Sequence, residues 1–240
     1  MRGKLSRIFP FAIALICLAS LLLALGCGSS SARYRFVLAA TGLSNNVDLQ
    51  VDGKTVQSAV GYGQTATYHS SSSGSHKFEI FPAGTTSNPY ASGTIKLSGD
   101  TTVIMQSTPQ PNPSILLSPF SDENTAPTTG NVKIRIIDSS PSAGLVDVYV
   151  IPTGTTIGGL SPQISSMNFN NPAPGQYLTL PTPPSPGSYD VIVTQAGTQN
   201  ILNGLTGTYS INALQIKTIV LLDASFGGGP FQQLVLNDLN

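Results

Sequence analysis

The stretch Asn46-Val47-Asp48-Leu49-Gln50-Val51-Asp52-Gly53 decides the fold class. Its apolar residues occupy every second position, which is typical of a strand with one buried face. It ends in Asp-Gly, a strong signal for a tight hairpin turn. The stretch Val146-Asp147-Val148-Tyr149-Val150 repeats the alternation 99 residues later. No helical periodicity follows Cys27, so we expect an all-β protein.

Short runs rich in β-branched and aromatic residues extend this pattern in both directions, with Gly, Pro and Ser between them. A first set of predicted strands covers 34–38, 46–51, 65–69, 76–81, 93–97 and 102–106, and a second set covers 131–138, 146–151, 176–180, 188–195, 207–212, 217–223 and 231–236. Strands at roughly ten-residue spacing predict an immunoglobulin-like antiparallel β-sandwich from each set.

The two sets present their features in the same order, which predicts an internal duplication. Gly63-Gln64-Thr65 corresponds to Gly175-Gln176-Tyr177, and Thr102 to Met105 corresponds to Thr218 to Leu221. The second copy holds an additional loop around Thr153 to Pro174.

Proline and polar residues mark the boundary between the copies. We predict a first sandwich repeat over 33–117, a linker over 118–130 that contains Pro119 and Pro127, and a second repeat over 131–240. Two arrangements stay open: a flexible linker that leaves the copies independent, or packing of the copies along Ser114 to Leu117.

The N-terminus has the pattern of a secretory signal. Arg2, Lys4 and Arg7 precede an apolar run over 8–25, and Gly26-Cys27 leads into a small, flexible stretch. Gly26-Cys27 resembles the bacterial lipobox, which implies a signal peptide over 1–26, lipidation of Cys27 and a tether over 27–32. Ordinary cleavage and a retained anchor are the alternatives. The resemblance implies an exported protein held by lipid in the cell envelope, at the outer membrane if the cell is Gram-negative.

Charge and cysteine content narrow the class further. Removal of the signal leaves eight basic residues against 11 acidic ones, a net charge of −3. Because no basic patch is present, we expect no nucleic-acid partner. Cys27 is the single cysteine left, so the exported part has no disulfide and depends on its core.

Several of these stretches resemble a bacterial family catalogued as domain of unknown function number 4397. The resemblance is carried by Val146 to Val150, by the Gly-Gln strand opening and by Ala196-Gly197-Thr198, and in the first copy by Val47 to Gly53 and Pro82-Ala83-Gly84-Thr85. The family occurs in extracellular and lipid-anchored proteins, often duplicated. The resemblance implies export and two sandwiches over most of 33–223, and it implies no activity.

Few residues suit catalysis or metal binding. His69 and His76 flank a Ser-Gly turn and supply half a metal site at most, so exposed strand-end positions are the simpler interpretation. Asp48 and Asp147 occupy the same place in the two copies, which favours a structural role: hydrogen bonds to N–H groups of a neighbouring loop. Motifs for a serine nucleophile, a phosphate loop or a calcium loop are missing. We predict no catalytic residue, no metal and no cofactor, and hence not an enzyme.

Two functions fit these observations. The first is a tethered binding or adhesion module whose loops contact an envelope protein or a polysaccharide, with the membrane as the second partner through Cys27. The second is a structural spacer of the envelope with no soluble ligand. The aromatic residues bear on the choice, because sugar binding uses exposed rings. The chain has no Trp, and we expect most of its tyrosines to lie in the core or on sheet faces.

Overall fold

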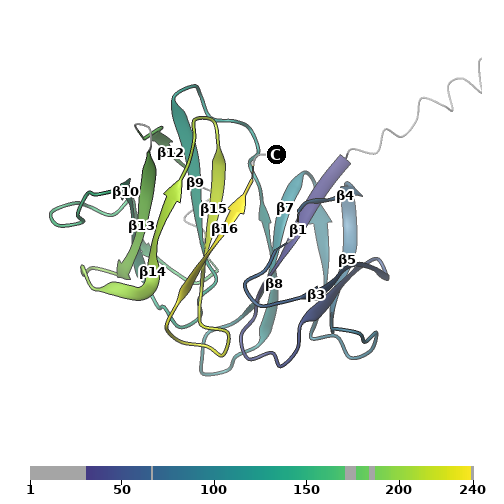
Figure 1. Ribbon diagram of the computed structural model, residues 1–240. Helices are drawn as coiled ribbons and strands as arrows, with labels where there is room; N and C mark the ends of the chain where they lie inside the picture. Colours follow the sequence, from purple (N-terminus) through teal and green to yellow (C-terminus); the bar gives the residue numbers. More distant parts are fainter. Residues whose placement is uncertain (1–30, 66, 171–176, 184–186, 239–240) are drawn as a thin grey trace, which may run out of the picture.

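The computed structural model describes residues 31–65, 67–170, 177–183 and 187–238. The predicted signal peptide and Cys27 lie outside these ranges. The described residues form strands and turns without a helix, which confirms the all-β prediction. None of them forms a helix long and apolar enough to cross a membrane. Four four-stranded sheets are arranged as two sandwich-like pairs (Figure 1).

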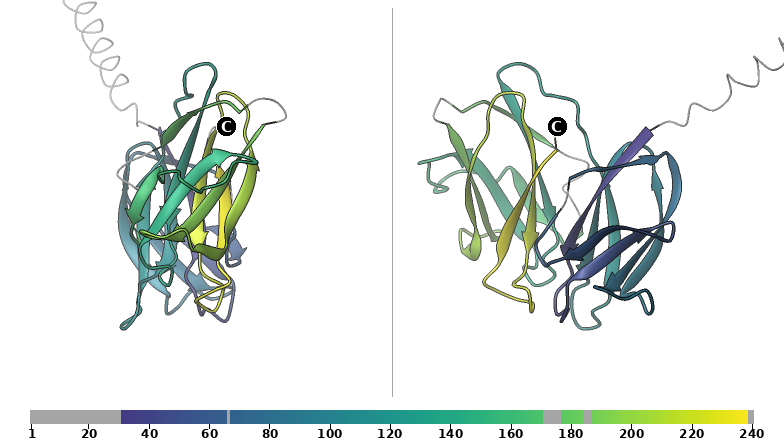
Figure 2. Two further views of the ribbon diagram at one scale, coloured as in Figure 1. Left: turned by 90° about the vertical axis from the view of Figure 1, so that its left-hand side faces the viewer. Right: turned by 45° about the vertical axis from the view of Figure 1, so that its right-hand side comes forward.

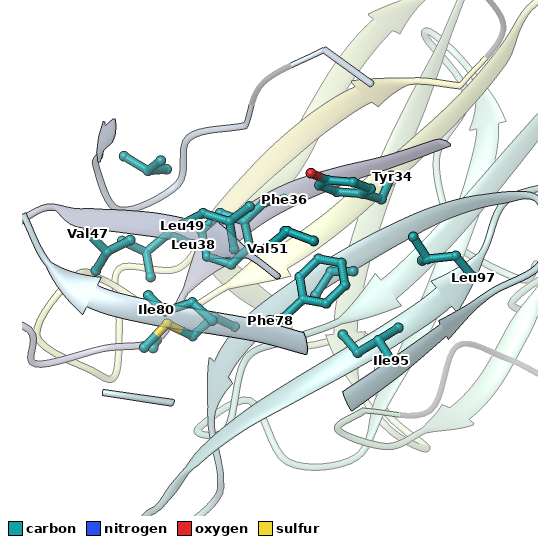
Figure 3. Packing of buried hydrophobic residues seen from close by; sticks show 14 of the residues in the cluster. Tyr34, Phe36, Leu38, Val47, Leu49, Val51, Phe78, Ile80, Ile95 and Leu97 are labelled. Atoms are coloured by element: carbon teal, nitrogen blue, oxygen red, sulfur yellow. The ribbon is translucent and has the colours of Figure 1, made fainter. Parts of the chain in front are cut away.

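The first sandwich places sheet β4-β1-β7-β8 against sheet β3-β2-β5-β6. Its strands are β1 (Ser31–Ala39), β2 (Val47–Val51), β3 (Lys54–Val60), β4 (His69–Ser72), β5 (Gly74–Pro82), β6 (Ala91–Leu97), β7 (Asp100–Ser107) and β8 (Ile115–Ser121). Alternate residues of these strands fill one core, shown in Figure 3, where Phe36, Leu49 and Phe78 meet between the two sheets. Each such buried side chain contributes roughly 1.5–3 kcal/mol.

The second sandwich places sheet β12-β9-β15-β16 against sheet β11-β10-β13-β14. Its strands are β9 (Asn131–Asp138), β10 (Val146–Pro152), β11 (Ile164–Met167), β12 (Leu178–Pro181), β13 (Ser188–Gln195), β14 (Ile201–Ser210), β15 (Ile216–Leu222) and β16 (Gln232–Asn237). Its strand order is that of the first sandwich with every strand number raised by eight. A separate core, which includes Ile134, Val148 and Val191, lies between its sheets.

One strand pair in each sandwich departs from the antiparallel prediction. β1 pairs with β7 in parallel, and β9 pairs with β15 in parallel. A parallel pair requires a long connection between its strands. Here that connection is the chain that builds the facing sheet, so the first strand of each sandwich lies beside the seventh.

The predicted linker is too long. β8 continues to Ser121 and pairs with β7 along its whole length, so the first sandwich extends past residue 117. Pro119 is compatible with a strand here because β8 lies at the edge of its sheet. Ile115 and Leu117 pack against the first core rather than against the second sandwich. Of the two arrangements left open, packing of the copies along Ser114 to Leu117 therefore does not hold for Ile115 and Leu117.

Three further sequence predictions are corrected by the strand positions. The predicted sets contain no strand at β3, β8 or β11, and β11 lies inside the stretch 153–174 that was expected to be loop. β4 begins at His69, the last residue of the predicted 65–69 strand, and β14 begins at Ile201 rather than at residue 207. β3, β4, β11 and β14 all lie at sheet edges, where one-sided pairing leaves a weaker hydrophobic pattern in the sequence.

Candidate functional site

Asp48 and Asp147 have the structural role predicted for them. The Asp48 carboxylate accepts hydrogen bonds from the backbone N–H groups of Ala59 and Gly84, both at 2.8 Å. The Asp147 carboxylate accepts the equivalent bonds from Ser166 at 2.7 Å and Gly197 at 2.8 Å. Asp48 therefore connects the edge strand β3 to the turn after β5, and Asp147 connects the edge strand β11 to the turn after β13.

His69 and His76 each have partners other than one another. The His69 ring stacks on Tyr34 with 5.5 Å between centroids. His76 Nδ1 lies 2.7 Å from the Asp52 carboxylate, and this hydrogen bond raises the pKa of His76. Within the described ranges, no group of three or more His, Cys, Asp or Glu side chains could hold a metal ion.

A third apolar cluster joins the two sandwiches. Sheet β4-β1-β7-β8 faces sheet β12-β9-β15-β16, and the surface between them is buried (Figure 2). The first sandwich contributes Val37, Ala39, Ile104 and Phe120, and the second contributes Ile137, Val220, Leu222 and Leu236. These side chains project from the sheet faces opposite to the two cores. The sandwiches are therefore packed against each other rather than separated by a flexible linker.

A buried ionic network lies within the same interface. Arg35, on β1, donates from Nη2 to the Asp238 carboxylate, from Nη1 to the Asn237 carbonyl at 2.9 Å, and from Nε to Thr102 at 2.8 Å. The guanidinium carbon lies 4.8 Å from the centroid of the Tyr68 ring. The side chains of Arg35 and Asp238 are 3% and 0% exposed, so this pair is shielded from water.

An arginine of the second sandwich makes the equivalent contacts. Arg135, on β9, donates to the Asp122 carboxylate, to the Ser121 carbonyl at 2.9 Å and to Thr218 at 2.9 Å. Its guanidinium carbon lies 4.8 Å from the Tyr177 centroid. Each arginine thus donates to the aspartate that follows the last strand of the other sandwich. Exchanging the two sandwiches therefore exchanges the pair Arg35–Asp238 with the pair Arg135–Asp122.

This network corrects the correspondence predicted for Tyr177. Tyr177 stacks on Arg135 and donates to Asp238 at 2.9 Å, whereas Tyr68 stacks on Arg35 and donates to Asp122 at 2.6 Å. Tyr177 therefore corresponds to Tyr68, not to Thr65. Burial raises the pKa of both tyrosines well above the usual range, so both hydroxyls are protonated donors.

A pocket opens where the interface ends. Its volume is about 160 Å³, and the β1–β2 and β15–β16 connections form much of its wall. The lining residues are Leu38, Ala40, Leu43, Ser44, Asn45, Asn46, Tyr62, Ser225 and Phe226. We call this space the junction pocket, because both sandwiches contribute to it.

Phe226 is the exposed aromatic ring of this site. It is 87% exposed, whereas every tyrosine of the described ranges is buried or half-buried. The expectation that most tyrosines serve the core or the sheets agrees with this. The exposed ring is a phenylalanine and not one of the tyrosines, and no strand pattern in the sequence singles out Phe226. The Gly227-Gly228-Gly229 run beside it marks a turn that places a large apolar side chain outside a strand.

Hydrogen bonds fix the turn that carries Phe226. The Gly42 N–H donates to the Ser225 carbonyl at 2.9 Å, which connects the two walls of the junction pocket. The Tyr62 hydroxyl donates to the Asp223 carbonyl at 2.8 Å. Within the turn, the Gly228 N–H donates to the Asp223 carboxylate at 3.1 Å. The backbone of the turn that carries Phe226 is therefore fixed by the surrounding structure.

Two buried carboxyl groups lie behind this turn. Asp223 also accepts hydrogen bonds from the hydroxyls of Ser140 and Ser142. Asp138 is fully buried, and within the described ranges its Oδ2 atom has no hydrogen-bond partner. Burial raises the pKa of Asp138 to about 7, and the charge of Asp223 acts in the same direction.

Comparison with known proteins gives one family match and several distantly similar solved structures. Residues 32–149 match the family described as Domain of unknown function (DUF4397). This match confirms the predicted resemblance for the first sandwich, and it continues through β9 into β10. No curated protein matches the chain.

Two solved structures are similar to this chain. One is a structure of alpha-glucan binding by a streptococcal virulence factor, with 9% identity, a TM-score of 0.28, and coverage of 79% of this chain and 92% of the other. The second is a product complex of the multi-modular glycogen-degrading pneumococcal virulence factor SpuA, with 11% identity and a TM-score of 0.29. That likeness covers 84% of this chain and 21% of the other.

Proposed function

We propose that this chain is a non-catalytic binding module of the bacterial cell envelope, anchored by lipid at Cys27 and built from two immunoglobulin-like copies that arose by duplication. The junction pocket supports the proposal most directly. Its walls come from both sandwiches, so the pocket exists only when the sandwiches are packed together. The partner of this binding module is a protein or polysaccharide of the cell envelope.

The exposed ring favours binding over a purely structural role. A large aromatic side chain held in water loses the free energy that its burial would supply. Exposed rings of this kind are common where proteins bind partners, because one ring gives a large contact area at low entropic cost. A spacer without a ligand has no use for Phe226 in this position.

The direction of β1 agrees with an N-terminal anchor. β1 runs from Ser31 to Ala39, next to the junction pocket (Figure 1). Ser31 and Ala32 are strand residues of the first sandwich, so the predicted tether over 27–32 extends two residues too far. Nine strand residues span roughly 30 Å. The pocket therefore lies near the end of β1 opposite to Ser31, which is the orientation that we expect for a binding module tethered through its N-terminus.

Photo-cross-linking in cells tests the binding proposal. A photoreactive phenylalanine analogue at position 226 of the full chain is expected to give a defined covalent adduct after irradiation. The same analogue at Leu214, which is 40% exposed and outside the pocket lining, is the matched control. Adducts from position 226 alone support the proposal. Absence of an adduct from position 226 would favour the spacer function.

The anchor is tested separately by mass spectrometry of the N-terminal peptide from cell membranes. The native chain is expected to begin at an acylated Cys27, and Cys27→Ala is expected to lose both the acyl groups and the membrane association. A native peptide that begins at a later, unmodified residue would contradict lipid anchoring and indicate a released protein.

A further inference from the structure

We infer that the junction pocket is a subsite for one ring of a neutral saccharide, with Phe226 as the stacking platform and Asn45 as a hydrogen-bonding group. The inference rests on the proposed function, since it names the ligand class for the same pocket. Size, charge and the pairing of an aromatic ring with amide side chains lead to it.

The size of the pocket limits the occupant. A volume of about 160 Å³ corresponds to roughly five water molecules in the liquid. This space accepts one sugar ring with its hydroxyl groups. It is smaller than the several hundred Å³ typical of pockets that enclose a drug-sized ligand. The pocket therefore suits a single unit of a chain that continues into solvent.

The absence of charged side chains from the lining disfavours ionic ligands. None of the described residues that line the pocket is charged. Asp223 lies behind the turn, and its carboxylate already accepts hydrogen bonds from Ser142 and Gly228. A phosphate, sulfate or carboxylate on the ligand would find no cation here, and an amine would find no free carboxylate at the lining. Such sites normally use charge-assisted pairs.

Phe226 supplies an apolar platform beside polar groups. The C–H face of a sugar ring packs on an aromatic face, whose quadrupole is negative, while the hydroxyls around the ring point outward. Because hydrogen bonds from Gly42 and Gly228 fix the backbone of the turn, only the side-chain torsions of Phe226 need ordering when a ligand arrives. Preorganisation of this kind reduces the entropic cost of binding.

The opposite wall supplies donors and acceptors. Ser44, Asn45 and Asn46 are all exposed at the pocket. The Asn46 side chain is held by a hydrogen bond from its Nδ2 atom to the Ala59 carbonyl at 3.1 Å. Within the described residues the Asn45 side chain makes no hydrogen bond. An amide offers one acceptor and two donors, which suits paired sugar hydroxyls.

The same groups disfavour an apolar ligand. A lipid chain or an apolar side chain in the pocket would remove water from Ser44 and Asn45 without replacing their hydrogen bonds. Each polar group buried in that way loses its hydrogen bonds to water without replacement, which opposes binding. A neutral polyol satisfies the amides and the aromatic ring together.

The chain contains no tryptophan, which gives a direct test. Phe226→Trp in the full chain keeps a stacking ring and makes it the only tryptophan. The probes are neutral oligosaccharides: maltotriose, cellotriose, chitotriose, and the neutral fragments released from the cell's own envelope polysaccharide. We expect at least one of them to shift the tryptophan emission saturably. Adding Asn45→Ala is expected to weaken the apparent affinity several-fold, up to about tenfold.

Ile201→Trp is the matched control, because Ile201 is 52% exposed and lies outside the pocket lining. Its emission is expected to stay constant with every probe, and an equal response would overturn the inference. If no neutral saccharide changes the emission of Phe226→Trp while position 226 still cross-links in cells, the sugar class is wrong and the binding function stands. If both signals are absent, the pocket has no binding role and both proposals fail.

Discussion

At the scale of single residues, Asp138 is a carboxyl group whose protonation near neutral pH depends on folding. Its Oδ1 atom accepts a hydrogen bond from the Ser140 N–H at 2.9 Å, whereas its Oδ2 atom has no partner within the described ranges. Burial raises its pKa from 3.8 to about 7, and the charge of Asp223 acts in the same direction. The folded protein therefore retains this proton at pH values where the unfolded chain has released it.

The sign of the pH dependence follows from linkage. Because the folded state binds the extra proton, the free energy of unfolding falls as the pH rises from about 4 to about 7. Asp138→Asn removes this titration and keeps an acceptor for Ser140. We expect it to stabilise the protein at pH 8 by on the order of 2–4 kcal/mol, and to have little effect near pH 4. Urea unfolding at both pH values measures the difference, and a loss of stability at pH 8 would contradict the assignment.

At the scale of strands, Asp48 and Asp147 compensate irregularities in the edge strands. Ala59 and Ser166 have φ angles of 56° and 49°, in the left-handed region that non-glycine residues seldom adopt. Both lie where the register shifts between an edge strand and its neighbour. The aspartates bind the N–H groups of these two residues, so a carboxylate stabilises each bulge.

Removal of the carboxylate is expected to destabilise the edge strands. Asp147→Ala leaves the N–H groups of Ser166 and Gly197 without their acceptor, at a cost of about 2–4 kcal/mol in the free energy of unfolding. Asp48→Ala is expected to cost less, because Asp48 is half-buried whereas Asp147 is 6% exposed. Urea unfolding compares the two variants.

A glycine at position 166 distinguishes the cost of the positive φ angle from the loss of the Asp147 hydrogen bonds. Ser166→Gly in the Asp147→Ala background is expected to recover part of the loss, since glycine adopts a positive φ without steric cost. If Asp147→Ala proves as stable as the native chain, its hydrogen bonds contribute nothing net and the structural role is wrong.

The strands show which parts of the fold the sequence could predict. Residues 131–138 and 188–195 were predicted with the bounds of β9 and β13, because central strands have long runs of apolar, β-branched residues. β11 was missed because Ile164-Ser165-Ser166-Met167 is short and polar in the middle. The role of Asp48 and Asp147 was predictable because the same polar residue interrupts the same apolar strand in both copies.

At the scale of the whole molecule, the contact between the sandwiches was beyond the sequence analysis. Arg35 and Arg135 occupy corresponding positions, each between two apolar or aromatic residues of its strand, and that signal could have indicated a buried pair. Asp122 was assigned to a linker because polar residues and prolines surround it. The alternation of a strand does not state which of its faces meets a second domain, so the interface and the junction pocket require the three-dimensional structure.

The interface network predicts that the two sandwiches unfold together. Arg135 and Asp122 are 4% and 0% exposed, and Tyr68 and Thr102 also donate to Asp122. Arg135→Met removes the cation that donates to Asp122 and leaves two buried aspartates, Asp122 and Asp238, with Arg35 as their one remaining cation in the network. Breaking a buried pair in this way costs about 3–5 kcal/mol, whereas a well-packed neutral replacement of both partners costs far less.

We therefore expect the native chain to unfold in urea in a single transition and Arg135→Met to unfold at much lower urea, with separate transitions for the two sandwiches. Adding Asp122→Asn to Arg135→Met is expected to recover part of the loss, since no unpaired charge then remains. Lys133→Met is the matched control on the same strand, because Lys133 pairs with Glu123, which is 51% exposed. Its effect is expected to stay below about 1 kcal/mol. Equal effects of Arg135→Met and Lys133→Met would show that the buried network does not couple the sandwiches, and the junction pocket would then lack the fixed walls on which its binding role depends.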